Sequence, residues 1–165
     1  QGYSSAASDV YKRQVINYPV TIASTYANSM APGSHINIYY KSLNDDGEVM
    51  FGKFISNIEV LDVKDSSGRH VFENSDEART PAYMLFAVPE ETHLLLRKAL
   101  YLTDYDVELL LIPNTATLSE DQKVTVSSLQ IEEFINSKTA FVSVDDLPQV
   151  SDNVTEDTSN TTNNE

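Results

Sequence analysis

The first half of the chain alternates apolar and polar residues, which predicts strands with one buried face. Over 35–41, Ile36, Ile38 and Tyr40 fall on one face and the residues between them fall on the other. The β-branched segment 15–24 contains one proline and indicates an edge strand or the entry to a strand. Further strands are predicted over 48–55 and 57–63.

Turn motifs separate these strands. The segment 31–34 has proline and glycine in the order that a type II turn requires. The tetrad 44–47, which ends in glycine, predicts a hairpin loop between antiparallel strands. A second turn is expected at 66–68, and the segment 73–80 is expected to be a charged loop.

The pattern changes after residue 81. The apolar runs 82–88 and 106–112 predict strands covered on both faces. Between them, 89–101 predicts a helix with its proline at the first helical position. If the two strands are neighbours, a parallel, right-handed crossover connects them. The apolar stripe of the helix consists of Leu95, Ala99 and Leu102.

Short elements are expected after this unit. The segment 124–126 predicts a strand, and Ser127 with Gln130 resembles a capping box for a helix that continues to Asn136. A closing strand is expected at 141–144. The whole pattern predicts an α+β fold, mainly β, with one main helix between two apolar strands.

The net charge of the chain excludes one class of partner. Its 25 acidic and 11 basic side chains give a net charge of −14, which repels phosphate backbones, so no nucleic-acid partner is expected. The absence of cysteine excludes disulfides, thiolate metal sites and cysteine nucleophiles. No apolar run in the sequence reaches the ~18 to 20 residues that a membrane-spanning helix requires.

Three histidines are the candidate catalytic side chains, because a nucleophile with its base requires histidine near serine or aspartate. His35 lies on the polar face of a predicted strand, His70 beside a turn, and His93 in the charged first turn of the helix. None belongs to a recognisable motif, and a solvated histidine explains each position. The sequence therefore predicts no catalytic residue.

The acidic residues form no recognisable site either. Asp45 and Asp46 precede a glycine, but the glutamate that a calcium loop needs at position 12 is missing. Glu59 and Asp62 fall on opposite faces of a strand and are expected to be solvated, and the leucine run 94–96 is expected to belong to the core. The sequence contains no glycine-rich phosphate loop, GxSxG motif or paired-histidine motif. We predict no metal site, no cofactor and no enzymatic activity.

The start of the chain does not resemble natural protein sequence. Residues 4–14 back-translate codon by codon to a common transposon-based sequencing adapter. We therefore interpret 1–14 as non-native and expect natural sequence to begin near Val15, with more of the protein encoded upstream. A membrane anchor or signal before Val15 would lie in that missing part.

The order of the motifs resembles that of a known family. The chain contains, in order, MAPGSHINIYY, KFISNIEVLDV, AYMLFAVPEETHLLLRKAL and YDVELLLIP. This order is similar to that of the Flp (Tad) pilus assembly protein CpaB, also called RcpC, and covers residues 18–113. Val88 and Ser34 depart from the family pattern, which has a threonine and an acidic residue there. The residues that carry the resemblance are Pro32, Gly33, Ile36, Ile38, Val60 to Val63, Pro89 and Glu90.

The resemblance implies a domain organisation and a location. Residues 15–42 would be the remnant of a truncated β-clip domain of the SAF type, 43–140 a CpaB/RcpC-type domain, and 141–165 a disordered acidic tail. The full-length protein would be membrane-anchored and extracytoplasmic, in the periplasm or the cell-wall zone. It would be a non-catalytic scaffold of the pilus machine, with other pilus assembly proteins, the secretin or the cell wall as partners.

Two alternatives remain at this point. β-clip relatives bind sugars, so the chain is alternatively a carbohydrate-binding or peptidoglycan-binding module in which tyrosines such as Tyr39 stack on the sugar rings. SAF domains also occur in sugar-acid dehydratases, but fold-level analogy is the only support for an enzyme.

Overall fold

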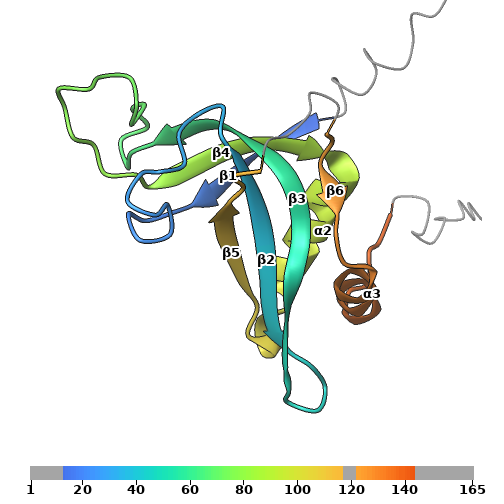
Figure 1. Ribbon diagram of the computed structural model, residues 1–165. Coiled ribbons are helices and arrows are strands. Elements are labelled where there is room, and N and C mark those ends of the chain that lie inside the picture. The colour runs from blue at the N-terminus through green and yellow to red at the C-terminus, as the bar shows by residue number, and fades with distance from the viewer. Residues whose placement is uncertain (1–12, 117–121, 144–165) are drawn as a thin grey trace, which may run out of the picture.

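The computed structural model describes residues 13–116 and 122–143 (Figure 1). Within them the fold is α+β and mainly β, which confirms the predicted class. Arg13 and Gln14, interpreted as adapter-derived, form the start of the first strand, whereas most of that segment and the expected tail from 144 onward lie outside the described residues. The elements are β1 (Arg13–Pro19), β2 (His35–Leu43), β3 (Val49–Lys64), β4 (Tyr83–Pro89), α2 (Glu90–Tyr101), the 3-10 helix η1 (Thr103–Tyr105), β5 (Glu108–Pro113), β6 (Thr125–Val126) and α3 (Leu129–Lys138).

The six described strands form one antiparallel sheet. Its order is β1-β4-β3-β2-β5, and β6 pairs with β3. The first part of β3 pairs with β2 and the last part pairs with β4. Figure 1 shows that β3 curves strongly, so that β1 and β4 run across one end of the sheet while β2 and β5 run away from it.

The single strand β3 replaces two predicted strands. The segments 48–55 and 57–63 were expected to be separate, yet they form one strand of 16 residues. The register of β3 against β2 shifts twice between Ile36 and Tyr39, and Asn57 has a φ of 63°. Extra residues of this kind are β-bulges, which bend a strand without ending it. The prediction was wrong because a bulge interrupts the alternation in the sequence just as a turn does.

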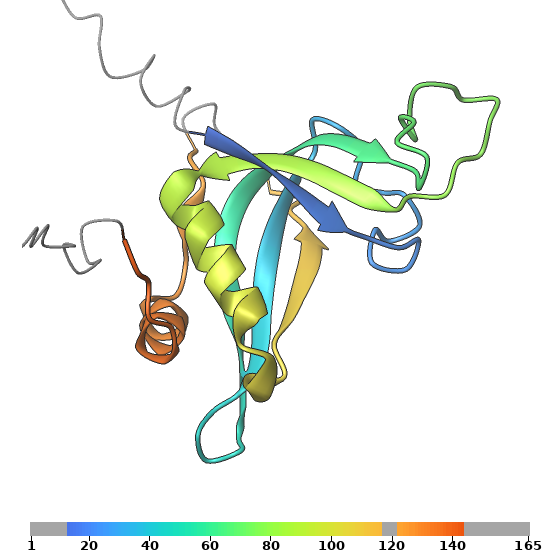
Figure 2. The ribbon, with the colours of Figure 1, turned by 180° about the vertical axis from the view of Figure 1, so that it is seen from behind.

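The unit of β4, α2 and β5 is not a parallel crossover. β3 and β2 lie between β4 and β5 in the sheet, so the two strands are not neighbours. Figure 2 shows α2 passing across one face of the sheet from the end of β4 to the start of β5. Two-sided cover was also wrongly expected for both runs. Leu109 and Leu111 of β5 are buried but Leu110 and Ile112 are only half-buried, and β4 shows the same alternation of buried with half-buried or exposed residues.

The turns have the predicted form. Gly33 has a φ of 85°, and the Ser34 N–H donates to the Ala31 carbonyl at 3.0 Å, which closes the turn at 31–34. The loop 44–47 joins β2 and β3 as a hairpin. Both motifs supply a glycine where φ must be positive, so local chemistry fixed these turns.

One hydrophobic core lies between the inner face of the sheet and the helices. The helix stripe of Leu95, Ala99 and Leu102 is buried, as predicted. The same core contains Ile38 of β2 and Phe86 of β4. The domain boundary expected at residue 42 falls inside β2, and the residues on its two sides share this core.

The two helices begin one residue later than predicted. α2 begins at Glu90, because Pro89 is still the last residue of β4. α3 follows Ser128, whose hydroxyl accepts a hydrogen bond from the Ile131 N–H at 3.2 Å. Ser127, expected to be the cap, instead donates its N–H to the backbone of β3. The Ser127 hydroxyl contacts the Ser56 hydroxyl of β3 and is therefore not the cap of the helix.

The end of the described chain also differs from the prediction. α3 extends two residues past Asn136 to Lys138. The described part of the expected closing strand, 141–143, contains no strand. Neither helix in the described ranges is long and apolar enough to cross a membrane.

Candidate functional site

Two of the three histidines lie beside acidic residues of β3, but in separate places. His35 on β2 is the cross-strand partner of Glu59. His70, in the loop after β3, places its Nδ1 2.6 Å from one carboxylate oxygen of Asp62, and the other oxygen accepts a hydrogen bond from the Val63 N–H. Glu59 and Asp62 therefore contact different neighbours and do not form an acid–base pair.

The third histidine is part of the contact between α2 and β1. His93 Nδ1 contacts the side-chain oxygen of Gln14, and Arg97 Nε lies 3.4 Å from its Nε2. Burial lowers the pKa of His93, and the nearby Arg97 charge lowers it further. His93 therefore links α2 to β1 through its contact with Gln14.

The two aspartates of the hairpin loop make structural contacts. The Asp45 carboxylate accepts hydrogen bonds from Lys138 Nζ at 2.6 Å and from the Tyr105 hydroxyl at 3.1 Å. These bonds, the one from Lys138 most, lower the pKa of Asp45. The Asp46 N–H donates to the Asn44 side chain at 3.0 Å. Within the described parts of the chain, no group of three histidine, aspartate or glutamate side chains is placed to hold a metal ion.

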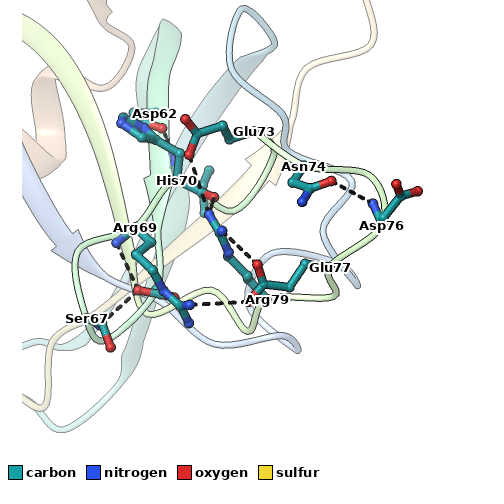
Figure 3. A network of polar contacts seen from close by, with 11 residues as sticks. Asp62, Ser67, Arg69, His70, Glu73, Asn74, Asp76, Glu77 and Arg79 are labelled. Carbon is teal, nitrogen blue, oxygen red and sulfur yellow. Dashed lines mark hydrogen bonds and ion pairs between the residues drawn. The ribbon is translucent and has the colours of Figure 1, made fainter.

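The loop 65–80 is held by a polar network around Arg79, whose side chain is only 12% exposed (Figure 3). Its Nη1 donates to the His70 carbonyl at 2.7 Å, and its Nη2 donates to the Glu77 carboxylate at 2.8 Å. Arg69 also pairs with Glu77, at 3.2 Å. The bond from Arg79 is the main cause of a lowered Glu77 pKa. Sequence reasoning found only a charged loop here; two arginines among four acidic residues were the signal for a network.

The side of the sheet opposite the core carries the candidate site. We call it the outer face, and it consists of Tyr39 of β2, Val49 and Phe51 of β3, and Leu110 and Ile112 of β5. Val49 is 64% exposed and Phe51 is 61% exposed. The rings of Tyr39 and Phe51 stack, with centroids 5.7 Å apart and planes at 29°. The outer face is therefore an apolar and aromatic surface on three adjacent strands.

Two lysines flank the aromatic pair. Lys53 is the cross-strand partner of Tyr39, and Lys41 is the partner of Phe51. Lys41 Nζ lies 2.7 Å from a carboxylate oxygen of Asp106, and this hydrogen bond raises the pKa of Lys41. Glu108 is the cross-strand partner of Lys41 on β5, so the outer face combines a ring platform with charges of both signs.

A second feature lies where the two edges of the sheet approach each other. The Tyr18 hydroxyl of β1 donates to the Leu109 carbonyl of β5 at 3.3 Å. Burial raises the pKa of Tyr18, and the negative charge of Glu108 raises it further, so the hydroxyl remains a donor. A side chain, and not a backbone ladder, joins β1 to β5.

Comparisons of the chain with protein-family models, with curated proteins and with solved structures found no match. The assignment to the CpaB family therefore rests on the order of the motifs in the sequence. What the family implies for this chain is accordingly a proposal.

Proposed function

We propose that this chain is the extracytoplasmic part of a non-catalytic assembly protein of a Flp-type (Tad) pilus machine, membrane-anchored in its full-length form. The order of its motifs supports the pilus assignment. The described residues support a role in contact, because His70 with Asp62, His93 and Asp45 each make a separate structural contact.

The observation that carries the contact role is the outer face. Folded proteins rarely leave contiguous apolar side chains in solvent unless the patch serves an interaction. On the outer face such side chains lie side by side on three strands, and the two most exposed, Val49 and Phe51, are near the tip of the β2–β3 hairpin. A protein partner that packs against this hairpin would cover them.

Binding to purified pilus components tests the proposal. The full chain is immobilised and exposed separately to the soluble domains of the secretin and to the pilin, with Phe51→Glu as the test variant. Leu61→Glu is the matched control, because Leu61 is also on β3 and 44% exposed but belongs to the part that pairs with β4. We expect one component to bind. Phe51→Glu should weaken this binding at least tenfold, and Leu61→Glu should leave it unchanged. If no component binds, or if both variants weaken binding equally, the proposal is wrong.

The stacked pair of Tyr39 and Phe51 supports a second candidate function, peptidoglycan binding. Aromatic rings offer apolar faces on which sugar rings stack, and the tyrosine hydroxyl adds a polar contact. Co-sedimentation with purified peptidoglycan separates the two candidates. Binding that Tyr39→Ala abolishes, without binding to any pilus component, would favour the carbohydrate module over the scaffold.

A further inference from the structure

β5 has the sequence of a central strand and the position of an edge strand. Its residues 109–112 are consecutively apolar, a pattern typical of strands covered on both faces. Among the described residues, however, only β2 pairs with it. Folded proteins usually protect edge strands with charged side chains, bulges or a covering segment. Glu108 and Pro113 stand at the two ends of β5, and the four residues between them carry no charge.

The hydrogen bonds to β2 determine which backbone groups of β5 point away from it. Asn114 donates its N–H to the His35 carbonyl at 2.9 Å, which makes these residues a bonded pair. Bonded pairs alternate along an antiparallel ladder, so Leu110 and Ile112 also bond to β2. The backbone groups that point to the free edge are those of Leu109 and Leu111.

A groove of about 580 Å³ runs beside this free edge. Its walls come from residues 18–26 on one side and 108–111 on the other, and Glu108 is the only charged residue among those that line it. The Tyr18 hydroxyl donates to the Leu109 carbonyl, so a single side chain already satisfies one of the edge groups. The groove is therefore mostly apolar, bordered by the Leu109 N–H and the backbone of Leu111, and acidic at one end.

We propose that the free edge of β5 binds an extended strand of a partner protein, which adds one strand to the sheet. The inference rests on the proposed contact role and adds a second contact at the edge of the same sheet. Backbone bonds to the Leu109 N–H and to both backbone groups of Leu111 would supply affinity, and alternate apolar side chains would enter the groove or extend the outer face. A basic residue would lie opposite Glu108. A second copy of the chain fits less well, because each copy carries a net charge of −14.

A synthetic peptide tests the edge directly on the full chain. The probe has six residues, alternating valine and threonine with a lysine at the carboxyl end, and a fluorescent label at the amino end. In an antiparallel arrangement this lysine lies opposite Glu108. Two control peptides carry N-methyl groups on the valines only or on the threonines only.

Because every second N–H of a strand faces one neighbour, one methylated peptide should bind at least tenfold more weakly by fluorescence anisotropy while the other binds like the parent. Amide hydrogen exchange gives a second readout. Bound peptide should slow the exchange of the Leu109 and Leu111 amides at least tenfold and leave the exchange of the Leu110 amide unchanged. The proposal is wrong if the parent peptide does not bind or if the two methylated peptides do not differ. A dimer in sedimentation that the peptide dissociates would also overturn it, since the occupant would be a second copy.

A pair of variants separates this inference from the proposed function. Leu110→Lys places a charge beside the edge and should weaken peptide binding at least tenfold, whereas Leu61→Lys, at an exposed position in the part of β3 that pairs with β4, should leave peptide binding unchanged. Peptide binding without binding to any pilus component would preserve the edge and refute the pilus role. A pilus component that binds Leu110→Lys as well as the original chain would refute the edge as its site and preserve the role.

Discussion

Tyr40 offers a test of the core in which the removal of a polar atom should stabilise the protein. Tyr40 and Ser42 point into the core from β2, and both are fully buried. Neither hydroxyl has a partner in hydrogen-bonding geometry. Burial raises the pKa of Tyr40, and the neighbouring Ser42 hydroxyl offsets this only in part. The tyrosine hydroxyl has thus left water without a full replacement for its hydrogen bonds.

A buried polar group without a partner costs about 1–3 kcal/mol, so Tyr40→Phe should raise the free energy of unfolding by about 1 kcal/mol or more. The ring itself stays, and with it the edge-to-face contact with Phe54 at 5.6 Å between centroids. Tyr18→Phe is the matched control. Its hydroxyl donates to the Leu109 carbonyl, so its loss should lower the free energy of unfolding by about 0.5–1.5 kcal/mol.

Urea unfolding followed by far-ultraviolet circular dichroism measures both changes, because the chain has no tryptophan for fluorescence. Opposite shifts of the two midpoints at equal slope are the expected result. If Tyr40→Phe lowers the midpoint as Tyr18→Phe does, the Tyr40 hydroxyl has a partner, such as a buried water, and the reasoning is refuted.

Three further results are expected. Phe86→Ala should lower the free energy of unfolding by about 3–5 kcal/mol in the same assay, because Phe86 is fully buried at the centre of the sheet; a loss below ~1 kcal/mol would mean that the core is not packed there. Asp45→Asn should make the stability of the protein less dependent on pH in acid. The folded protein lowers the Asp45 pKa, so this carboxylate contributes stability above its ordinary pKa of 3.8, and the contribution disappears as the pH falls through the pKa of the folded state. The urea midpoints of the variant and of the original chain should therefore differ at pH 6 and converge near pH 2. Arg79→Met should open the loop 65–80 to limited proteolysis while β-sheet content stays constant, whereas Lys64→Met, at the end of β3 before the loop, should not; equal cleavage of both would show that Arg79 does not hold the loop.

Local chemistry made much of the fold predictable. The alternation over β2, the glycine turns and the stripe of α2 each depend on residues close in sequence, and all were predicted. The topology was less accessible, because Asn57 shows its left-handed conformation only through its tertiary setting. Its N–H donates to the Asn37 side chain, and Asn114 donates to its side-chain oxygen, so residues from three distant segments hold the bulge. No local sequence pattern predicts such a contact.

The candidate site was predictable only in part. Tyr39 was named as a residue able to stack on a ligand, and it lies on the outer face. Its stacking partner, Phe51, was not identified, because the pairing of β2 with β3 determines which side chains become neighbours. The apolar run of β5 predicts a strand covered on both faces, whereas β5 lies at the edge of the sheet. Sequence patterns report which faces are apolar, and the order of the strands decides which of those faces are covered.

The pairing of β1 with β4 has a consequence for how the protein is made. Val15 lies opposite Ala87, 72 positions later in the chain. At synthesis rates of about 5–20 residues per second, β1 waits about 4–15 s before its partner exists. The hairpin of β2 and β3 can form during that interval, because its contacts are local. We therefore expect β1 to join the sheet only after β2 and β3 have paired, although β1 precedes both in the sequence.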